Sequence, residues 1–390
     1  MRGNREPEVP SDQHHARWRT VFPGLMLTAS LCLMVAGCGA RGELAFMPHG
    51  AAPGTVETVL VSTTRASAAA PALYSDARSA DPQFARFDIS VPPDRKPGTV
   101  TFSKRNVVNP ETDFVVTSFK RLPDDRAFLS AVNTEVARRP PAARDAVLFV
   151  HGYNTNFAEG LFRQAQLQYD YGRHSVSVHF AWPSHPSTLA YIADRESALY
   201  SRDALQTTID TLGRSNATRM DLVGHSMGAF LLMDTLRLMA RTENDAFFRK
   251  VNAVILISPD IDIDVFKKEA EPVLARGVKI YVLVSSGDRA LKISARLRGE
   301  RSRLGSIKSA DELGGIPVTV IDLSAIESSD SLGHFKSATS PDVIAFVNAV
   351  HKAGGGVFNE GRQRGLVQGS VAVLQQGTNI LLSPLGSTTQ

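Results

Sequence analysis

Residues 220–230 read "MDLVGHSMGAF" and place Ser226 between Gly224 and Gly228. The G-x-S-x-G pattern says little alone, because a chain of 390 residues contains one by chance about one time in six. Here, however, a buried strand pattern precedes the motif and a strongly apolar helix pattern follows it. This context predicts that Ser226 is a nucleophile on a sharp strand-to-helix turn, where side chains in place of the glycines would clash.

Segments around the motif alternate between apolar strands and helices. Continuous apolar runs predict buried strands at 146–150, 175–182, 219–224, 251–258, 278–286 and 316–324. One of the intervening helices is predicted as a single long element over 189–213. Strands that are apolar throughout favour an α/β fold, with a mostly parallel sheet and helices on both faces.

The N-terminal part of the domain has a different rhythm. Runs rich in β-branched and aromatic residues predict extra strands at 55–64, 85–91 and 113–119. The Ser-, Ala- and Asp-rich stretch 67–83 between the first two runs is predicted to be a loop.

A serine nucleophile needs a base, and in this strand-to-helix chemistry the partners follow in the order Ser, Asp or Glu, His. The chain has ten histidines, but only His334 and His351 follow Ser226. His334 lies in a loop after the last predicted strand, where sites form in such sheets, whereas His351 ends the last predicted helix. We favour His334 as the base. A surface histidine is the alternative for His351, and a capping or solvated one for His334.

The acid is expected after a strand between Ser226 and His334. Asp288 follows the strand predicted at 278–286 and has the usual position. Asp260 and Asp262, with Asp264, follow the previous strand and compete with it; shaping of the pocket is their other possible role. Capping of the next helix is the simpler explanation of that cluster.

Two backbone N–H groups are expected to bind the oxyanion of the reaction. One is that of Met227, which follows the nucleophile at a helix N-terminus. The other is expected from the glycine turn in "VLFVHGYNTNF", residues 147–157, with Tyr153 as first candidate and Asn154 as second. A strand-ending turn with no catalytic role is the alternative.

These stretches together resemble the α/β-hydrolase fold over residues 55–352, and more narrowly a poorly characterised bacterial family of α/β-hydrolases that are often lipoproteins. The stretches that carry the resemblance are "VLFVHGYNTNF", "FAWPS" (180–184), "YIADRESALYS" (191–201), "LVGHSMGAF", "ISPDIDIDVF" (257–266), "SSGDRAL" (285–291) and "LGHF" (332–335). The resemblance implies an esterase- or lipase-like hydrolase with Ser226, Asp288 and His334 as its triad. It does not imply a substrate.

The N-terminus is a separate feature. The apolar stretch from Val21 to Gly37 follows Arg17 and Arg19, which is typical of a secretory signal. Its end, Val35-Ala36-Gly37-Cys38, resembles the lipobox of bacterial lipoproteins, which implies that Cys38 is lipidated and becomes the first mature residue. An uncleaved membrane anchor is the alternative, although 17 residues are at the lower limit for crossing a bilayer.

The expected organisation follows from these features. It comprises a signal peptide over 1–37, a tether over 38–54, the hydrolase domain over 55–352 and a Gly-rich tail over 353–390, which forms a strand pair or nothing regular. The protein is expected in the cell envelope, on its periplasmic or outer-membrane side, and held to a membrane through Cys38.

Composition and missing motifs narrow the function. A net charge of +4 gives no indication of nucleic-acid binding. The chain lacks H-E-x-x-H, a cysteine pair for zinc, a P-loop and a dinucleotide fingerprint, so we expect no metal and no cofactor. The basic stretch 289–308 is better explained as a solvated face than as a site for anionic lipid.

Three functions remain open at this stage. The first is hydrolysis of a lipid or other acyl ester in the envelope. The second uses the same triad on another acyl bond, as an amidase, thioesterase or acyltransferase does. The third is a non-catalytic envelope protein that keeps the fold, which the intact Ser–Asp–His order disfavours.

Overall fold

The computed structural model describes residues 1, 41–48, 50–103, 107–172, 175–242, 245–285, 291, 302–324, 339–341, 344, 371–375 and 378–382. The chain divides into two units, Met1–Arg41 and Gly42–Gln390, and the fold belongs to the second. Three predicted functional residues, Cys38, Asp288 and His334, lie outside the described residues, as does His351.

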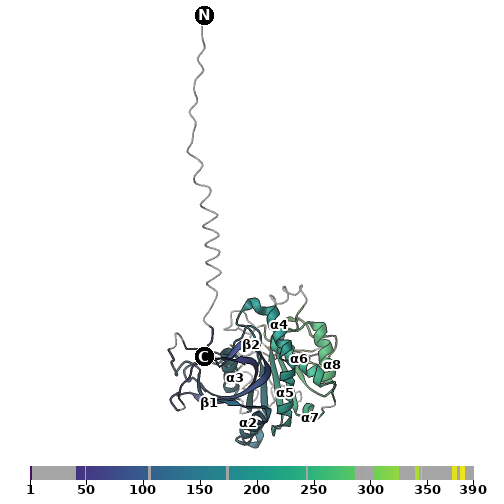
Figure 1. The fold of residues 1–390 in the computed structure, drawn as a ribbon. Coiled ribbons are helices and arrows are strands. Elements are labelled where there is room, and N and C mark those ends of the chain that lie inside the picture. Colours follow the sequence, from purple (N-terminus) through teal and green to yellow (C-terminus); the bar gives the residue numbers. More distant parts are fainter. Residues whose placement is uncertain are drawn as a thin grey trace, which may run out of the picture. The chain divides into compact units, whose positions relative to one another are not determined.

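A single sheet of eleven strands forms the centre of this unit (Figure 1). The strands are β1 (Thr55–Ser67), β2 (Tyr74–Val91), β3 (Val115–Leu122), β4 (Ala146–Val150), β5 (Val176–Ala181), β6 (Met220–His225), β7 (Val251–Ile257), β8 (Ile280–Val284), β9 (Thr319–Asp322), β10 (Val371–Gln375) and β11 (Thr378–Leu382). Their order in the sheet is β11-β10-β9-β8-β7-β6-β4-β5-β1-β2-β3.

The middle of the sheet is parallel and its two margins are antiparallel. Parallel pairing runs without a break from β1 through β5, β4, β6, β7 and β8 to β9. The hairpin β1–β2 with β3 flanks it on one side, and β10 with β11 flanks it on the other. The N-terminal strands expected beside a parallel sheet are therefore present, and the C-terminal tail contributes a strand pair.

Helices cover both faces of the sheet. The α-helices in the described part of the chain are α2 (Asp125–Ala137), α3 (Phe157–Asp170), α4 (Tyr191–Tyr200), α5 (Arg202–Arg214), α6 (Met227–Met239), α7 (Asp245–Phe248) and α8 (Ile263–Leu274). Neighbouring residues of β1 show the two faces: Leu60 belongs to the core with α2, α5, α6 and α8, whereas Val59 and Val61 belong to the core with α3. This alternation is what a strand buried on both sides requires.

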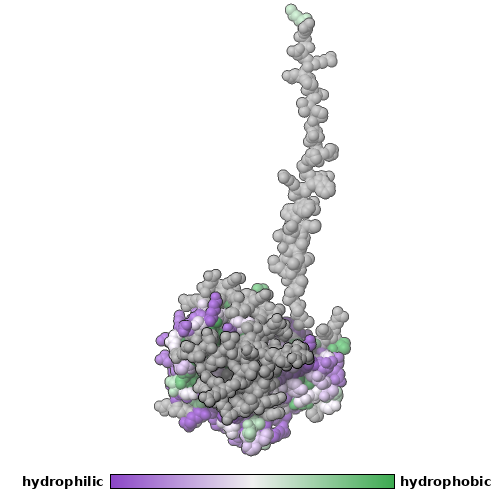
Figure 2. All heavy atoms as spheres, turned by 180° about the vertical axis from the view of Figure 1, so that it is seen from behind, coloured by the Kyte–Doolittle hydropathy of each residue, from purple (hydrophilic) through white to green (hydrophobic). Residues whose placement is uncertain are grey.

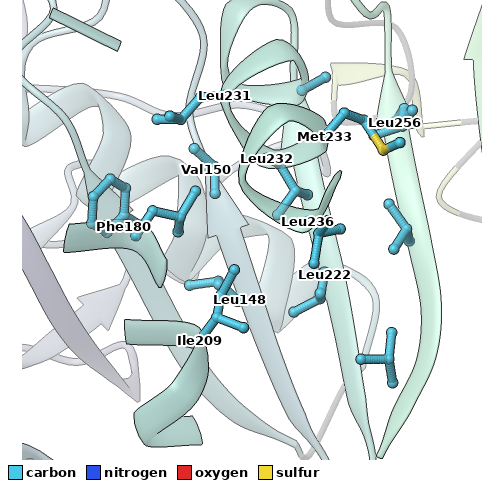
Figure 3. Packing of buried hydrophobic residues seen from close by; sticks show 14 of the residues in the cluster. Leu148, Val150, Phe180, Ile209, Leu222, Leu231, Leu232, Met233, Leu236 and Leu256 are labelled. Atoms are coloured by element: carbon cyan, nitrogen blue, oxygen red, sulfur yellow. The ribbon is translucent and has the colours of Figure 1, made fainter. Parts of the chain in front are cut away.

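The larger core lies under α6. Four of its side chains, Leu231, Leu232, Met233 and Leu236, are buried with residues of β4, β6 and β7 (Figure 3). The surface differs from this buried core: on the face shown in Figure 2, the described residues form hydrophilic areas with small hydrophobic areas among them. Burial of this apolar helix against three strands fixes the position of its first residue, which follows Ser226 directly. The arrangement is that of the α/β-hydrolase fold.

Two predicted elements differ from the structure in the N-terminal half. The helix predicted over 189–213 is two helices, α4 and α5, which meet at Ser201. The Ser201 hydroxyl is buried and bonds to Thr64 Oγ1 at 2.7 Å and to the Ser197 carbonyl at 2.8 Å. A serine that satisfies its hydroxyl on backbone and on a neighbouring strand competes with a continuous helix, which explains the break.

The loop predicted over 67–83 is largely strand, because β2 begins at Tyr74. Its first half pairs with β1 through Arg65↔Arg78 and Thr63↔Gln83, whereas β3 joins β2 only from Phe84 onward. Pro82 therefore lies where β2 is an edge strand, a position that tolerates proline. Cross-strand pairing overrides the local loop composition.

The segment expected to be a tether over 38–54 is partly packed on the domain. Leu44 and Ala45 are buried, and the Ala45 carbonyl accepts a hydrogen bond from Val116 N at 2.8 Å. A Cβ at Gly42 would lie 2.4 Å from the Phe102 ring, so this part of the chain lies close against the domain.

Candidate active site

Ser226 lies at the turn between β6 and α6 and has a strained backbone. Its φ is 54° and its ψ is −120°, a conformation that residues with a Cβ adopt rarely. The residue is buried, its N–H donates to the Ile257 carbonyl at 2.9 Å, and its carbonyl accepts from Asp260 N at 3.2 Å. The bonds to β7 and to the loop after it hold the turn in this conformation.

The glycines of the motif are required by close approaches of backbone. A Cβ at Gly228 would lie 2.2 Å from the His151 carbonyl oxygen and 2.4 Å from that of Val150. A Cβ at Gly224 would lie 2.6 Å from the Ala229 Cα. The helix thus begins directly against the end of β4, which brings its first N–H groups, Met227's among them, to the carboxyl edge of the sheet.

The turn after β4 lies against Ser226. A Cβ at Gly152 would lie 3.0 Å from Ser226 Cβ and 2.7 Å from His225 Nδ1. The turn is therefore adjacent to Ser226. Asn154 in this turn also has a positive φ, 54°, and its N–H donates to Asp194 Oδ2 at 3.3 Å. Both residues remain predictions for the second oxyanion donor, and the Asn154 N–H already has a partner in Asp194.

His151 supports this turn and is poorly suited to act as a base. Its Nδ1 lies 2.8 Å from the Gly152 carbonyl oxygen and its Nε2 3.1 Å from that of Trp182, and the two rings are stacked with centroids 5.1 Å apart. Burial, with the charge of Arg65, holds the pKa of His151 well below its usual range. The His151 imidazole is therefore neutral and lines the site.

The carboxylates that compete with Asp288 have other partners. Asp262 caps α8, accepting hydrogen bonds from Asp264 N at 3.0 Å and Val265 N at 3.3 Å, as the capping interpretation predicts. Asp260 is buried, accepts a hydrogen bond from the Tyr191 hydroxyl at 2.5 Å, and lies 3.3 Å from Arg303 Nε. Asp260 therefore lies beside Ser226, with its carboxylate bound to other residues.

Sequence reasoning missed two buried charged residues at this edge, Arg65 and Asp194, which are 1% and 0% exposed. Asp194 lies in the stretch "YIADRESALYS", which supported the family resemblance without any assigned role, and Ser184 ends the stretch "FAWPS". Arg65 follows a run of strand residues and has no motif around it, so no sequence signal singled it out.

The described residues contain neither a metal-binding cluster nor a membrane-spanning helix. No cluster of three or more His, Cys, Asp or Glu side chains is arranged there to hold a metal ion. None of the described helices has the length and apolar character needed to cross a bilayer.

Comparison with solved structures gives distant similarities. A Pyrobaculum calidifontis esterase is 13% identical with a TM-score of 0.33, covering 85% of this chain and 93% of its own. Alpha/beta hydrolase domain-containing protein 10 from mouse is 14% identical with a TM-score of 0.32, covering 55% and 90%. A dienelactone hydrolase-like promiscuous phosphotriesterase from metagenomic libraries is 12% identical with a TM-score of 0.32, covering 77% and 96%. At these TM-scores the similarities say nothing about this chain's substrate.

A search of curated proteins found no match. The model of one protein family matches residues 127–351, which is more than half of the chain and includes the Ser226 turn, the turn after β4 and the predicted Asp288 and His334. The chain therefore belongs to the family described as "Alpha/beta hydrolase of unknown function (DUF900)".

Proposed function

We propose that this protein is a serine hydrolase that cleaves an acyl ester through an acyl-enzyme on Ser226. The observation that carries the proposal is the backbone of Ser226, left-handed and strained at the carboxyl end of a central strand and directly before a buried helix. A serine with no chemical task could be replaced there by glycine, which adopts a positive φ at no steric cost.

In the proposed mechanism His334 accepts the proton of the Ser226 hydroxyl as its oxygen attacks the acyl carbonyl. The N–H groups of Met227 and Tyr153 donate to the oxyanion of the tetrahedral intermediate. His334 then returns the proton to the leaving alcohol, and a water activated by the same histidine releases the acid from Ser226. Asp288 orients the imidazole and stabilises its charged form.

A fluorophosphonate probe tests the nucleophile. Wild type is expected to be labelled, and Ser226→Ala to lose both labelling and hydrolysis of p-nitrophenyl esters. The matched control is Ser258→Ala, because Ser258 is also buried, also has a positive φ (44°), and follows the adjacent strand β7. Labelling that is absent from wild type, or that persists in Ser226→Ala, would favour the non-catalytic protein.

Paired variants test the other members of the triad. His334→Ala is expected to abolish hydrolysis while His351→Ala preserves it, and Asp288→Asn to lower kcat far more than Asp262→Asn, which removes only a helix cap. The bond class is tested separately, with oxyesters, thioesters and amides of matched acyl length. Faster turnover of amides or thioesters would move the proposal to the second class of acyl chemistry.

We further propose that the protein is a membrane-held lipoprotein of the cell envelope, anchored through Cys38. The chain offers its own control, since Cys32 and Cys38 are its only cysteines. Cys38→Ser is expected to abolish incorporation of labelled palmitate and to release the protein from the membrane fraction, and Cys32→Ser to change neither. Membrane retention of Cys38→Ser would instead support an uncleaved anchor over Val21–Gly37.

A further inference from the structure

Two buried charged residues, Arg65 and Asp194, are each bonded to the turn that carries the proposed oxyanion donor. Arg65 comes from β1 and Asp194 from α4, and neither is accessible to solvent beyond 1%. The proposed mechanism uses neither residue. Burying a charge is costly unless it is well hydrogen-bonded, so the bonds of each residue indicate its role.

The Arg65 guanidinium binds backbone carbonyls on three segments. Its Nη2 donates to the Thr155 carbonyl at 2.7 Å and to that of Ser184 at 3.2 Å, and its Nη1 donates to that of Ser75 at 3.2 Å. Burial lowers the pKa of Arg65 to about 10, opposed by Asp194, so the side chain is still charged at neutral pH. The Thr155 carbonyl of the turn thus accepts a hydrogen bond from a buried positive charge.

The Asp194 carboxylate binds the N–H side of the same turn. It accepts hydrogen bonds from Asn154 N at 3.3 Å, from the Ser184 hydroxyl at 2.5 Å and from His185 N at 2.8 Å. The Ser184 oxygen in turn accepts from Thr155 N at 3.2 Å. Both N–H groups that follow Tyr153 are therefore tied, directly or through Ser184, to one buried carboxylate.

Helix α4 also contacts the other half of the site. Tyr191, one turn before Asp194, packs edge-on against Tyr153 with ring centroids 5.4 Å apart. Its hydroxyl donates to Asp260, whose N–H bonds to the Ser226 carbonyl. One helix thus connects the nucleophile turn with the turn after β4, and a shift of α4 would change the distance between them.

We propose that Arg65 and Asp194 are positioning residues that hold the Gly152–Thr155 turn, and with it the Tyr153 N–H, in place for the oxyanion. The inference rests on the proposed function. The strained φ of Asn154 is consistent with it, because such a conformation persists only where its surroundings over-determine it. A donor displaced by about 1 Å loses much of its effect on the transition state.

The chain supplies a control elsewhere in two buried charged residues, Arg95 and Asp170, which form an ion pair and whose side chains are 4% and 3% exposed. Asp170 likewise accepts backbone and side-chain donors, Gly98 N at 2.7 Å and Gln166 Nε2 at 2.6 Å. It ends α3, whose first turn follows the oxyanion turn, so a helix of fourteen residues separates Asp170 from that turn by roughly 20 Å. Asp170→Asn therefore neutralises a comparably buried and hydrogen-bonded carboxylate away from the site.

The experiment measures kcat and KM for a p-nitrophenyl ester on wild-type protein, Asp194→Asn and Asp170→Asn. Asp194→Asn is expected to lower kcat by about tenfold to a hundredfold with KM changed by less than about threefold, because the oxyanion exists only in the transition state. Asp170→Asn is expected to keep kcat within about twofold of wild type. Equal kcat in the two variants would overturn the inference, whatever their Tm values.

Two further measurements keep the test open if Asp194→Asn does not fold. Ser184→Ala removes only the hydroxyl that bridges Asp194 and Thr155. Arg65→Lys keeps the positive charge but loses the planar guanidinium that binds several carbonyls at once. Each variant is expected to lower kcat by about tenfold. Hydrogen exchange of the 150–157 backbone is expected to speed up in both and to stay unchanged in Asp170→Asn. Unchanged kcat and unchanged exchange would overturn the inference. A wild type without Ser226-dependent hydrolysis would overturn the proposed function as well, which separates the two failures.

Discussion

The two edges of the parallel sheet handle their turns differently. At the carboxyl edge, the turns after β4, β6 and β7 each contain a residue with a side chain at positive φ, namely Asn154, Ser226 and Ser258. At the amino edge, the positive φ values of the described residues all belong to glycines, at 172, 277, 314 and 315. The fourth non-glycine case, Leu73, lies in the hairpin turn that follows the carboxyl end of β1.

The difference shows where strain is kept. At the amino edge the turns end helices, and glycine relaxes them at no steric cost. At the carboxyl edge three neighbouring turns keep side chains that cost free energy, on the order of 1–3 kcal/mol each. Buried bonds to Asp194, Ile257 and Leu283 hold these turns. Strain concentrated at one edge of the sheet marks that edge as the functional one.

The largest expected effect is at the glycine of the nucleophile turn. Gly228→Ala would place a Cβ against two backbone oxygens, which cannot move without shifting β4, so we expect a loss of at least about 3 kcal/mol. Gly277→Ala at the amino edge meets nothing within 4 Å and strains only its φ of 77°, at about 1–2 kcal/mol. Urea unfolding measures the loss of stability in both variants. Equal losses would mean that the two edges do not differ in their tolerance of a side chain.

A second prediction concerns acid sensitivity near the carboxyl edge. Burial lowers the pKa of His179 in β5 from 6.5 to about 3, so the folded protein excludes a proton that the unfolded chain binds below pH 6.5. Stability is therefore complete above pH 6.5 and is lost as the pH falls toward 3. His179→Gln is expected to make this decline shallower, by up to about 1.4 kcal/mol per pH unit. Chemical unfolding at a series of pH values measures both slopes, and parallel slopes would contradict the prediction.

The smallest effect is expected at the amino edge. Arg219 and Asp145 form an ion pair there, with Nη2 and Oδ2 2.9 Å apart and side chains 60% and 29% exposed. Because solvent screens such a pair, Asp145→Asn is expected to cost about 0–1 kcal/mol and to leave hydrolysis unchanged. A thermal unfolding curve and an ester assay check both statements. A large loss of activity would mean that the two edges are coupled.

The apolar strands were predictable because each is buried on both faces. The continuous run at 146–150 coincides with β4, and the runs at 175–182 and 251–258 differ from β5 and β7 only at their ends. Prediction was wrong where long-range contacts decide. The Ser201 hydroxyl divides a helical pattern because it reaches a distant strand, and pairing with β1 makes a strand of a Ser- and Asp-rich stretch.

The α/β architecture, the sharp turn at Ser226 and the family were all readable from the sequence, because a buried strand, a glycine-flanked serine and a buried helix are adjacent in the chain. Their order is local, and the glycine requirement is a steric rule that any such turn obeys. Asp288 and His334 remain predictions from chain order. The tertiary structure was needed to show that Arg65 and Asp194 both bind the turn after β4, since they are far apart in the chain and reach it from β1 and α4. Hydrogen bonding of buried charges is enforced by the low dielectric of the interior, which no sequence window records.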